Sequence, residues 1–127
     1  MPEQDSREFV VGRLRITVEY RRTPEDEGQA VRVFGMVGNG ERQVLRFDCF
    51  VDDPHYHYDP DGKNELHHMQ DEGIEDPVEW TLHRLERNLA EMIRRAGFGS
   101  LADQVDQEQV ARLLPAIQDT LLAPAVS

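Results

Sequence analysis

Three histidines in one short stretch, His55, His57 and His68, form the residue pattern with the clearest chemical meaning. Successive side chains of a strand alternate between its faces, so an extended segment places His55 and His57 on the same side. A hairpin that turns at Asp61-Gly62 places His68 opposite His55. Three imidazoles on adjacent strands can bind Zn²⁺ and leave a fourth position for water. The spacing therefore predicts a divalent-metal site made by these three histidines.

Four aspartates lie close to the histidines in the sequence: Asp52, Asp53, Asp59 and Asp61. Carboxylates at these positions would orient the imidazoles or offer oxygen ligands to a harder cation. A water bound to the metal ionises near neutral pH and becomes a nucleophile, which makes a metal-dependent hydrolase one hypothesis. The competing hypothesis is a binding module that uses the acidic His-rich hairpin of residues 52–68 to contact a protein partner or a second copy of the chain.

Aromatic residues form a second group of candidates. Tyr56 and Tyr58 alternate with the histidines and therefore face the other side of the hairpin. Trp80 falls outside the apolar stripe of a predicted helix, near Arg84, which favours a contact with the hairpin or with a partner. These three aromatic residues are the candidate interface or ligand residues. Cys49 lies within a predicted strand and is interpreted as a small buried residue rather than a nucleophile.

The negative charge is concentrated in one part of the chain. The formal net charge is −11, and residues 51–80 hold ten acids, one base and four of the five histidines. A chain of this composition lacks the basic surface that tracks phosphates, so a nucleic acid is not an expected partner. The acidity does support a third hypothesis, an antitoxin-like or inhibitor protein that mimics nucleic acid. Salt adaptation or solubility would explain the charge equally well.

The length of 127 residues suits one domain. No apolar run approaches the ~18 residues of a membrane span, and the polar start is not a secretory signal. With a single cysteine, a cytoplasmic location is expected. We expect a single domain over 1–127, with a disordered start at 1–8, an antiparallel sheet over 9–69 and a helical part over 76–122.

Strict alternation of apolar and polar residues predicts a half-buried strand over 9–22. Further strands are predicted over 30–37 and 43–51, and a three-residue loop at 39–41 would place Val33 opposite Phe47. The histidine segment adds one or two short strands.

The helical part begins at Asp76-Pro77, where the aspartate caps the helix and Glu79 completes a capping box. An apolar stripe then extends to Ala96, and Gly97 ends the helix. A second helical region follows, with a kink or a division expected at Pro115. The order predicts an α+β fold: an antiparallel β-meander of four to five strands followed by two C-terminal helices packed on one face.

The run LRFDCFVDDPHYHYDPDGKNE, followed by DPVEWTL, resembles a family of small uncharacterised prokaryotic proteins. The resemblance covers the chain from about Leu14 to Gly97. It implies no activity, cofactor or partner.

Overall fold

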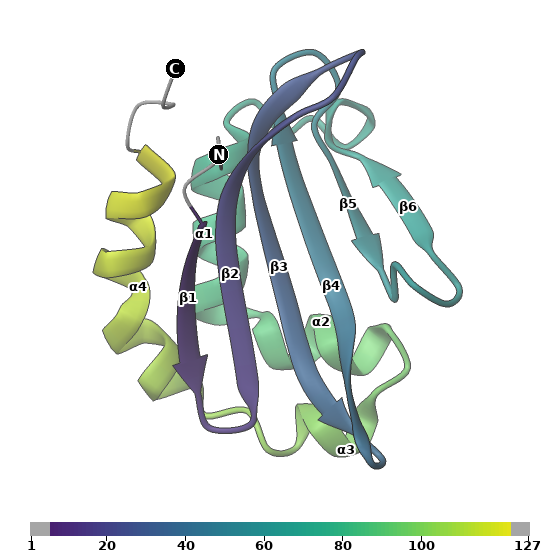
Figure 1. The fold of residues 1–127 in the computed structure, drawn as a ribbon, viewed down its shortest axis with the longest axis vertical. Helices are drawn as coiled ribbons and strands as arrows, with labels where there is room; N and C mark the ends of the chain where they lie inside the picture. Colours follow the sequence, from purple (N-terminus) through teal and green to yellow (C-terminus); the bar gives the residue numbers. More distant parts are fainter. Residues whose placement is uncertain (1–5, 123–127) are drawn as a thin grey trace.

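Six antiparallel strands follow one another in sequence order and form one sheet, and the helices cover one of its faces (Figure 1). The computed structural model describes residues 6–122. The strands are β1 (Ser6–Val11), β2 (Leu14–Arg22), β3 (Glu27–Val37), β4 (Gly40–Phe50), β5 (His55–Tyr58) and β6 (Glu65–His68). A 3₁₀ turn (Met69–Glu72) precedes α1 (Pro77–Arg87), α2 (Leu89–Arg95), α3 (Gly99–Ala102) and α4 (Gln107–Leu122). The predicted α+β meander is confirmed. The sheet has six strands where four to five were expected, and four helices follow it where two were expected.

The first expected strand is in fact a hairpin. Strands β1 and β2 pair with Phe9 opposite Ile16 and Val11 opposite Leu14. Gly12 turns the chain with a φ of 58°, a left-handed conformation that glycine adopts without strain. Residues 6–8, expected in a disordered start, belong to β1. Residues 1–5 and 123–127 lie outside the described part of the chain.

The register of β3 and β4 also differs from the prediction. Val33 lies opposite Leu45, and Val31 lies opposite Phe47, so the predicted pairing was wrong by two residues. The loop has two residues, Gly38 and Asn39, in place of the expected three, because Val37 pairs with Gly40. An irregularity beside Val33 then shifts the register. A shift of two residues preserves the face on which each side chain lies, so the apolar residues still meet in the core.

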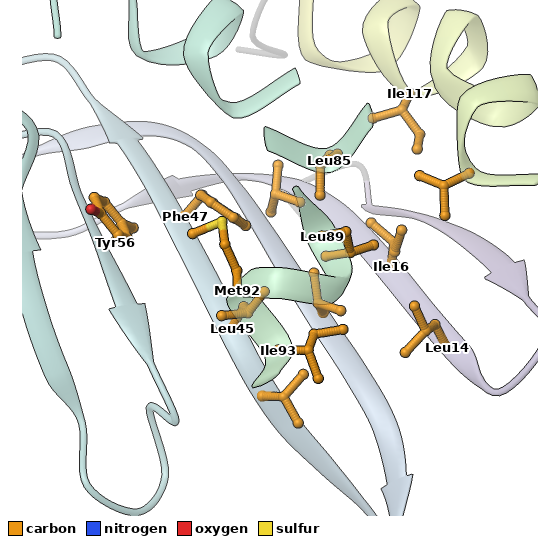
Figure 2. Packing of buried hydrophobic residues seen from close by; sticks show 14 of the residues in the cluster. Leu14, Ile16, Leu45, Phe47, Tyr56, Leu85, Leu89, Met92, Ile93 and Ile117 are labelled. Atoms are coloured by element: carbon orange, nitrogen blue, oxygen red, sulfur yellow. The ribbon is translucent and has the colours of Figure 1, made fainter. Parts of the chain in front are cut away.

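The apolar face of the sheet packs against the apolar stripe of the helices (Figure 2). Most of the largest fully buried side chains come from these two layers: Ile16, Leu45, Phe47, Leu85, Leu89, Ile93 and Ile117. The Asp76 carboxylate accepts a hydrogen bond from the backbone N–H of Glu79, as the predicted helix cap requires. Within residues 6–122, no helix has the length and apolar content needed to cross a membrane.

The helix expected up to Ala96 is interrupted at Asn88, which separates α1 from α2. Gln107 satisfies the backbone groups released there. Its amide nitrogen donates to the carbonyls of Leu85 at 3.0 Å and Glu86 at 2.6 Å, and its amide oxygen accepts from the N–H of Ala90 at 3.3 Å. A distant glutamine thus replaces part of the helical hydrogen bonding. By contrast, α4 continues through Pro115 as a single helix instead of dividing there.

Replacing Gly28 by alanine should destabilise the protein by about 1–3 kcal/mol. Gly28 faces Phe50 across β3 and β4, and a Cβ there would overlap the carbonyl oxygen of Cys49 and the Cα of Phe50. Backbone atoms held in a sheet cannot move aside cheaply. Gly40→Ala is the matched control, since nothing lies within 4 Å of its Cβ position. Urea denaturation that shows equal stability for both variants would contradict this prediction.

Candidate metal centre

The histidine hairpin forms in the predicted register. Strands β5 and β6 pair His55 with His68 and His57 with Leu66. Strand β5 also pairs with β4, a neighbour that was not predicted. His55 lies opposite Asp48, and His57 lies opposite Arg46. Since Tyr56 and Tyr58 belong to the core on the helical side, the two histidines face the side of the sheet away from the helices.

Asp48 is the centre of this group. Its side chain has no exposed surface, although the residue lies on the face of the sheet that the helices do not cover. Its Oδ2 atom lies 3.1 Å from Nε2 of His55 and 3.5 Å from Nε2 of His57. Arg46 Nε donates to the same oxygen at 2.9 Å, and Arg21 Nη1 donates to Oδ1 at 3.1 Å. The carboxylate is therefore surrounded by two arginines and two histidines.

Both imidazole rings are held by their Nδ1 atoms. Nδ1 of His55 lies 2.8 Å from the backbone carbonyl of Asp53, which can only accept, so this nitrogen carries the hydrogen. Nδ1 of His57 lies 2.7 Å from the side-chain oxygen of Asn64 and donates in the same way. Both Nε2 atoms consequently point towards Asp48. Fixing one ring nitrogen with an oxygen acceptor is the usual way in which proteins orient metal-binding histidines.

Asp48, His55 and His57 can each offer one ligand atom, and these atoms all lie within 4.8 Å of one another. Among residues 6–122, this is the one group of three or more such residues that meets this criterion. His68, the third predicted ligand, lies outside the group. Its ring centroid is 6.1 Å from that of His55, and its Nδ1 contacts the exposed carboxylate of Asp53 at 2.9 Å. The structure thus brings Asp48, and not His68, together with His55 and His57.

Of the four predicted aspartates, only Asp53 touches the histidines, through its carbonyl and its carboxylate. Asp59 is buried in the turn and pairs with Arg42 at 2.7 Å. Asp61 accepts from Gln43 at 3.4 Å.

Asp52 helps to fix the loop before β5 through its backbone N–H rather than its side chain. Asp26 accepts from the N–H groups of Asp52 and Asp53 at 3.0 and 2.8 Å, so it fixes the loop that precedes β5. Most of these acids therefore shape the loops and do not orient the imidazoles.

The charges of the group favour an ionised aspartate and a protonated histidine. Burial raises the pKa of Asp48, but the contacts with His55 and His57 and the charge of Arg46 outweigh it and hold that pKa far below its usual range. Burial lowers the pKa of His55, but the hydrogen bonds to Asp48 and to the Asp53 carbonyl outweigh it and raise that pKa above 6.5. In metal-free protein, these contacts therefore favour the protonated form of His55 beside an ionised Asp48.

The His55–Asp48 pair should make stability depend on pH. Because the pKa of His55 is raised by folding, its stabilisation is complete below the unfolded value of about 6.5 and is lost as the pH rises through the folded pKa. In the presence of a chelator, we expect wild type to exceed His55→Gln in free energy of unfolding by more near pH ~5.5 than near pH ~9. Urea denaturation at both pH values measures this difference, and an unchanged difference would refute the prediction.

The aromatic candidates meet on the helical side of the hairpin. The rings of Tyr56 and Trp80 lie 4.9 Å apart, which confirms that the tryptophan packs on the hairpin, and Arg84 lies over the indole. The Tyr56 hydroxyl donates to Glu72 at 2.8 Å.

The thiol of Cys49 lies against α1. Its Sγ atom lies 3.5 Å from the hydroxyl of Thr81, and burial raises the pKa of the thiol to about 12. A thiol with this pKa is not an activated nucleophile.

One comparison with known proteins gives a match. A family model described as a domain of unknown function (DUF7700) matches residues 8–121. No curated protein and no solved structure matches the chain.

Proposed function

The chain belongs to the DUF7700 family, whose function is unknown, and we propose that it is a binding module for a divalent transition metal held by Asp48, His55 and His57. The observation that carries this proposal is the orientation of the two imidazoles. Both Nδ1 atoms donate to oxygens of the protein, and both Nε2 atoms point at one buried carboxylate oxygen.

The separations of the ligand atoms fit a small metal ion. In a tetrahedral zinc site with bonds of about 2.0 Å, neighbouring ligand atoms are about 3.3 Å apart. The distances from Asp48 Oδ2 to Nε2 of His55 and of His57 are 3.1 and 3.5 Å. A set of two imidazoles and one carboxylate suits zinc and the neighbouring first-row metals, and it favours them over magnesium or calcium.

Arg46 and Arg21 both contact the proposed ligands, and Arg46 must move before a metal can bind. Arg46 Nη2 donates to Nε2 of His57 at 3.0 Å and so occupies the lone pair that a metal requires. Binding must displace this guanidinium and release the proton of His55, since a metal binds only the neutral imidazole. We therefore expect metal affinity to increase with pH. Arg21 can keep its hydrogen bond to the other carboxylate oxygen of Asp48.

A metal-dependent hydrolase is the second candidate function. Three protein ligands leave a coordination position for water, as in catalytic zinc sites. Arg21 and Arg46, which both contact Asp48, would then be available to stabilise a developing negative charge on a substrate.

The test is a calorimetric titration of Zn²⁺ into protein that was produced without a histidine tag and treated with a chelator. Wild type should bind one ion per chain, and its thermal denaturation midpoint should increase with zinc. His57→Gln should lose both effects, and His68→Ala, on the same hairpin, should retain them. Absence of binding by wild type, or equal losses in the two variants, would overturn the proposal.

Asn64→Gly provides a second variant if His57→Gln does not fold. It leaves every proposed ligand in place and removes the acceptor that orients His57, and glycine adopts the φ of 52° at this position without strain. Loss of such an acceptor typically weakens metal binding by about 10–100-fold. Unchanged zinc affinity in this variant would also count against the proposed site.

A further inference from the structure

An open groove of about 430 Å³ lies on the helical side of the hairpin, on the opposite face of the sheet from the metal centre. The residues that line it and matter here are Tyr56, Tyr58, Trp80, Arg84, Met92 and Arg95. We call this the Trp80 groove. It brings together the three aromatic residues that the sequence analysis selected as interface or ligand candidates.

The partly exposed indole of Trp80 is the aromatic surface of the groove, since Tyr56 and Tyr58 are only 5% and 6% exposed. The ring of Tyr56 lies 4.9 Å from Trp80 and 5.7 Å from Tyr58, and Met92 closes part of the surface from α2. Trp80 and Tyr58 each carry an arginine over the ring, at 5.5 Å for Arg84 and 4.6 Å for Arg95. Aromatic rings and guanidinium planes together favour a flat, conjugated ligand that stacks on them.

The two arginines differ in their charge balance. Arg95 donates to Glu65 at 2.6 Å and is neutralised by that contact. Within residues 6–122, Arg84 makes no ion pair, and its Nε is buried without a hydrogen-bond partner. The Arg84 guanidinium is therefore available to form a charge-assisted hydrogen bond with an anion that enters the groove. Glu91, the acidic residue in the lining, already accepts from the amide of Asn88.

From these contacts we infer that the Trp80 groove binds a small planar anion. Its aromatic ring packs against the partly exposed Trp80, and its carboxylate or phosphate accepts hydrogen bonds from the guanidinium of Arg84. Aromatic acids and nucleoside monophosphates share this chemistry. The inference does not depend on the proposed metal, because no residue of the groove belongs to the metal centre.

The test uses the fluorescence of Trp80, which is the only tryptophan in the chain. Benzoate and adenosine 5′-monophosphate are titrated into wild type in the presence of a chelator, and the neutral molecules benzamide and adenosine are the matched controls. We expect a saturable change with benzoate, with the monophosphate or with both, and affinity at least tenfold weaker for the corresponding neutral molecule, since a hydrogen bond to a charged group contributes about 1.5–3 kcal/mol. Binding by only one anion identifies the source of the ligand.

Two variants assign the effect to Arg84. Arg84→Gln should weaken anion binding at least tenfold, because it removes the charge and keeps an unbranched polar side chain. Arg112→Gln, which removes an exposed arginine of α4, should bind as wild type does. No saturable signal with either anion, equal binding of charged and neutral molecules, or unchanged affinity in Arg84→Gln would overturn the inference. Calorimetry on wild type with benzoate and benzamide gives the same decision if Arg84→Gln does not fold.

Discussion

Replacing Asp48 by asparagine should lower the free energy of unfolding of the metal-free protein by about 3–5 kcal/mol. The carboxylate is fully buried and accepts from Arg21, Arg46 and His55. Asparagine removes the only negative charge in this contact group and leaves two largely buried guanidinium groups without their partner. Breaking a buried ion pair on one side is costly for this reason, even where the complete pair adds little stability.

The matched control for this variant is Asp53→Asn. Asp53 also pairs with a histidine of the hairpin, but its side chain and that of His68 are about half exposed. Surface pairs of this kind contribute about 0–1 kcal/mol, so this variant should stay close to wild type. Urea denaturation in the presence of a chelator measures both variants. A loss for Asp48→Asn no larger than that for Asp53→Asn would show that the buried charge does not organise the hairpin.

Replacing Arg46 by methionine should change stability and metal affinity in opposite directions. The metal-free protein loses the hydrogen bond to Asp48 and becomes less stable. The same change frees Nε2 of His57, to which Arg46 Nη2 donates at 3.0 Å, and removes a positive charge beside the metal. Since a hydrogen bond to a charged group contributes about 1.5–3 kcal/mol, zinc affinity should increase about 10–100-fold.

Arg42→Met is the control for this prediction. Arg42 also lies on β4 and pairs with an aspartate of the hairpin, Asp59, but it does not contact the metal centre. It should leave zinc affinity unchanged. Calorimetric titration of both variants at the same pH gives the comparison. Equal or weaker zinc binding by Arg46→Met would mean that the arginine does not compete with the metal, and the proposed site would lose its main physical support.

The histidine hairpin could be predicted because its turn chemistry is local. Asp61-Gly62 marks the turn, and strand alternation then fixes which residues face each other. Asp48 could not be found in the same way, because its contact with His55 depends on pairing between β4 and β5 across an irregular loop. One signal was present: the run FDCF places a charged residue between apolar ones inside a predicted strand. A buried acid there requires partners of opposite charge.

The other differences have similarly non-local or overlooked causes. The hairpin at Gly12 was missed although the apolar positions change from odd numbers at Phe9 and Val11 to even numbers at Leu14 and Ile16. The interruption at Asn88 depends on Gln107, whose amide bonds to both sides of the break. No window of sequence around Asn88 contains that partner. By contrast, the cap at Asp76 and the left-handed Gly97 are local signals, and the structure has both.

The most direct test of the metal centre is anomalous diffraction from crystals of the zinc-loaded protein, recorded on both sides of the zinc absorption edge. We expect one strong peak per chain, at about 2.0–2.2 Å from Nε2 of His55, Nε2 of His57 and a carboxylate oxygen of Asp48. Arg46 should have moved away from His57 in the same crystals. A peak bound instead by His67 or His68, or no peak at any of these histidines, would contradict the proposed metal centre.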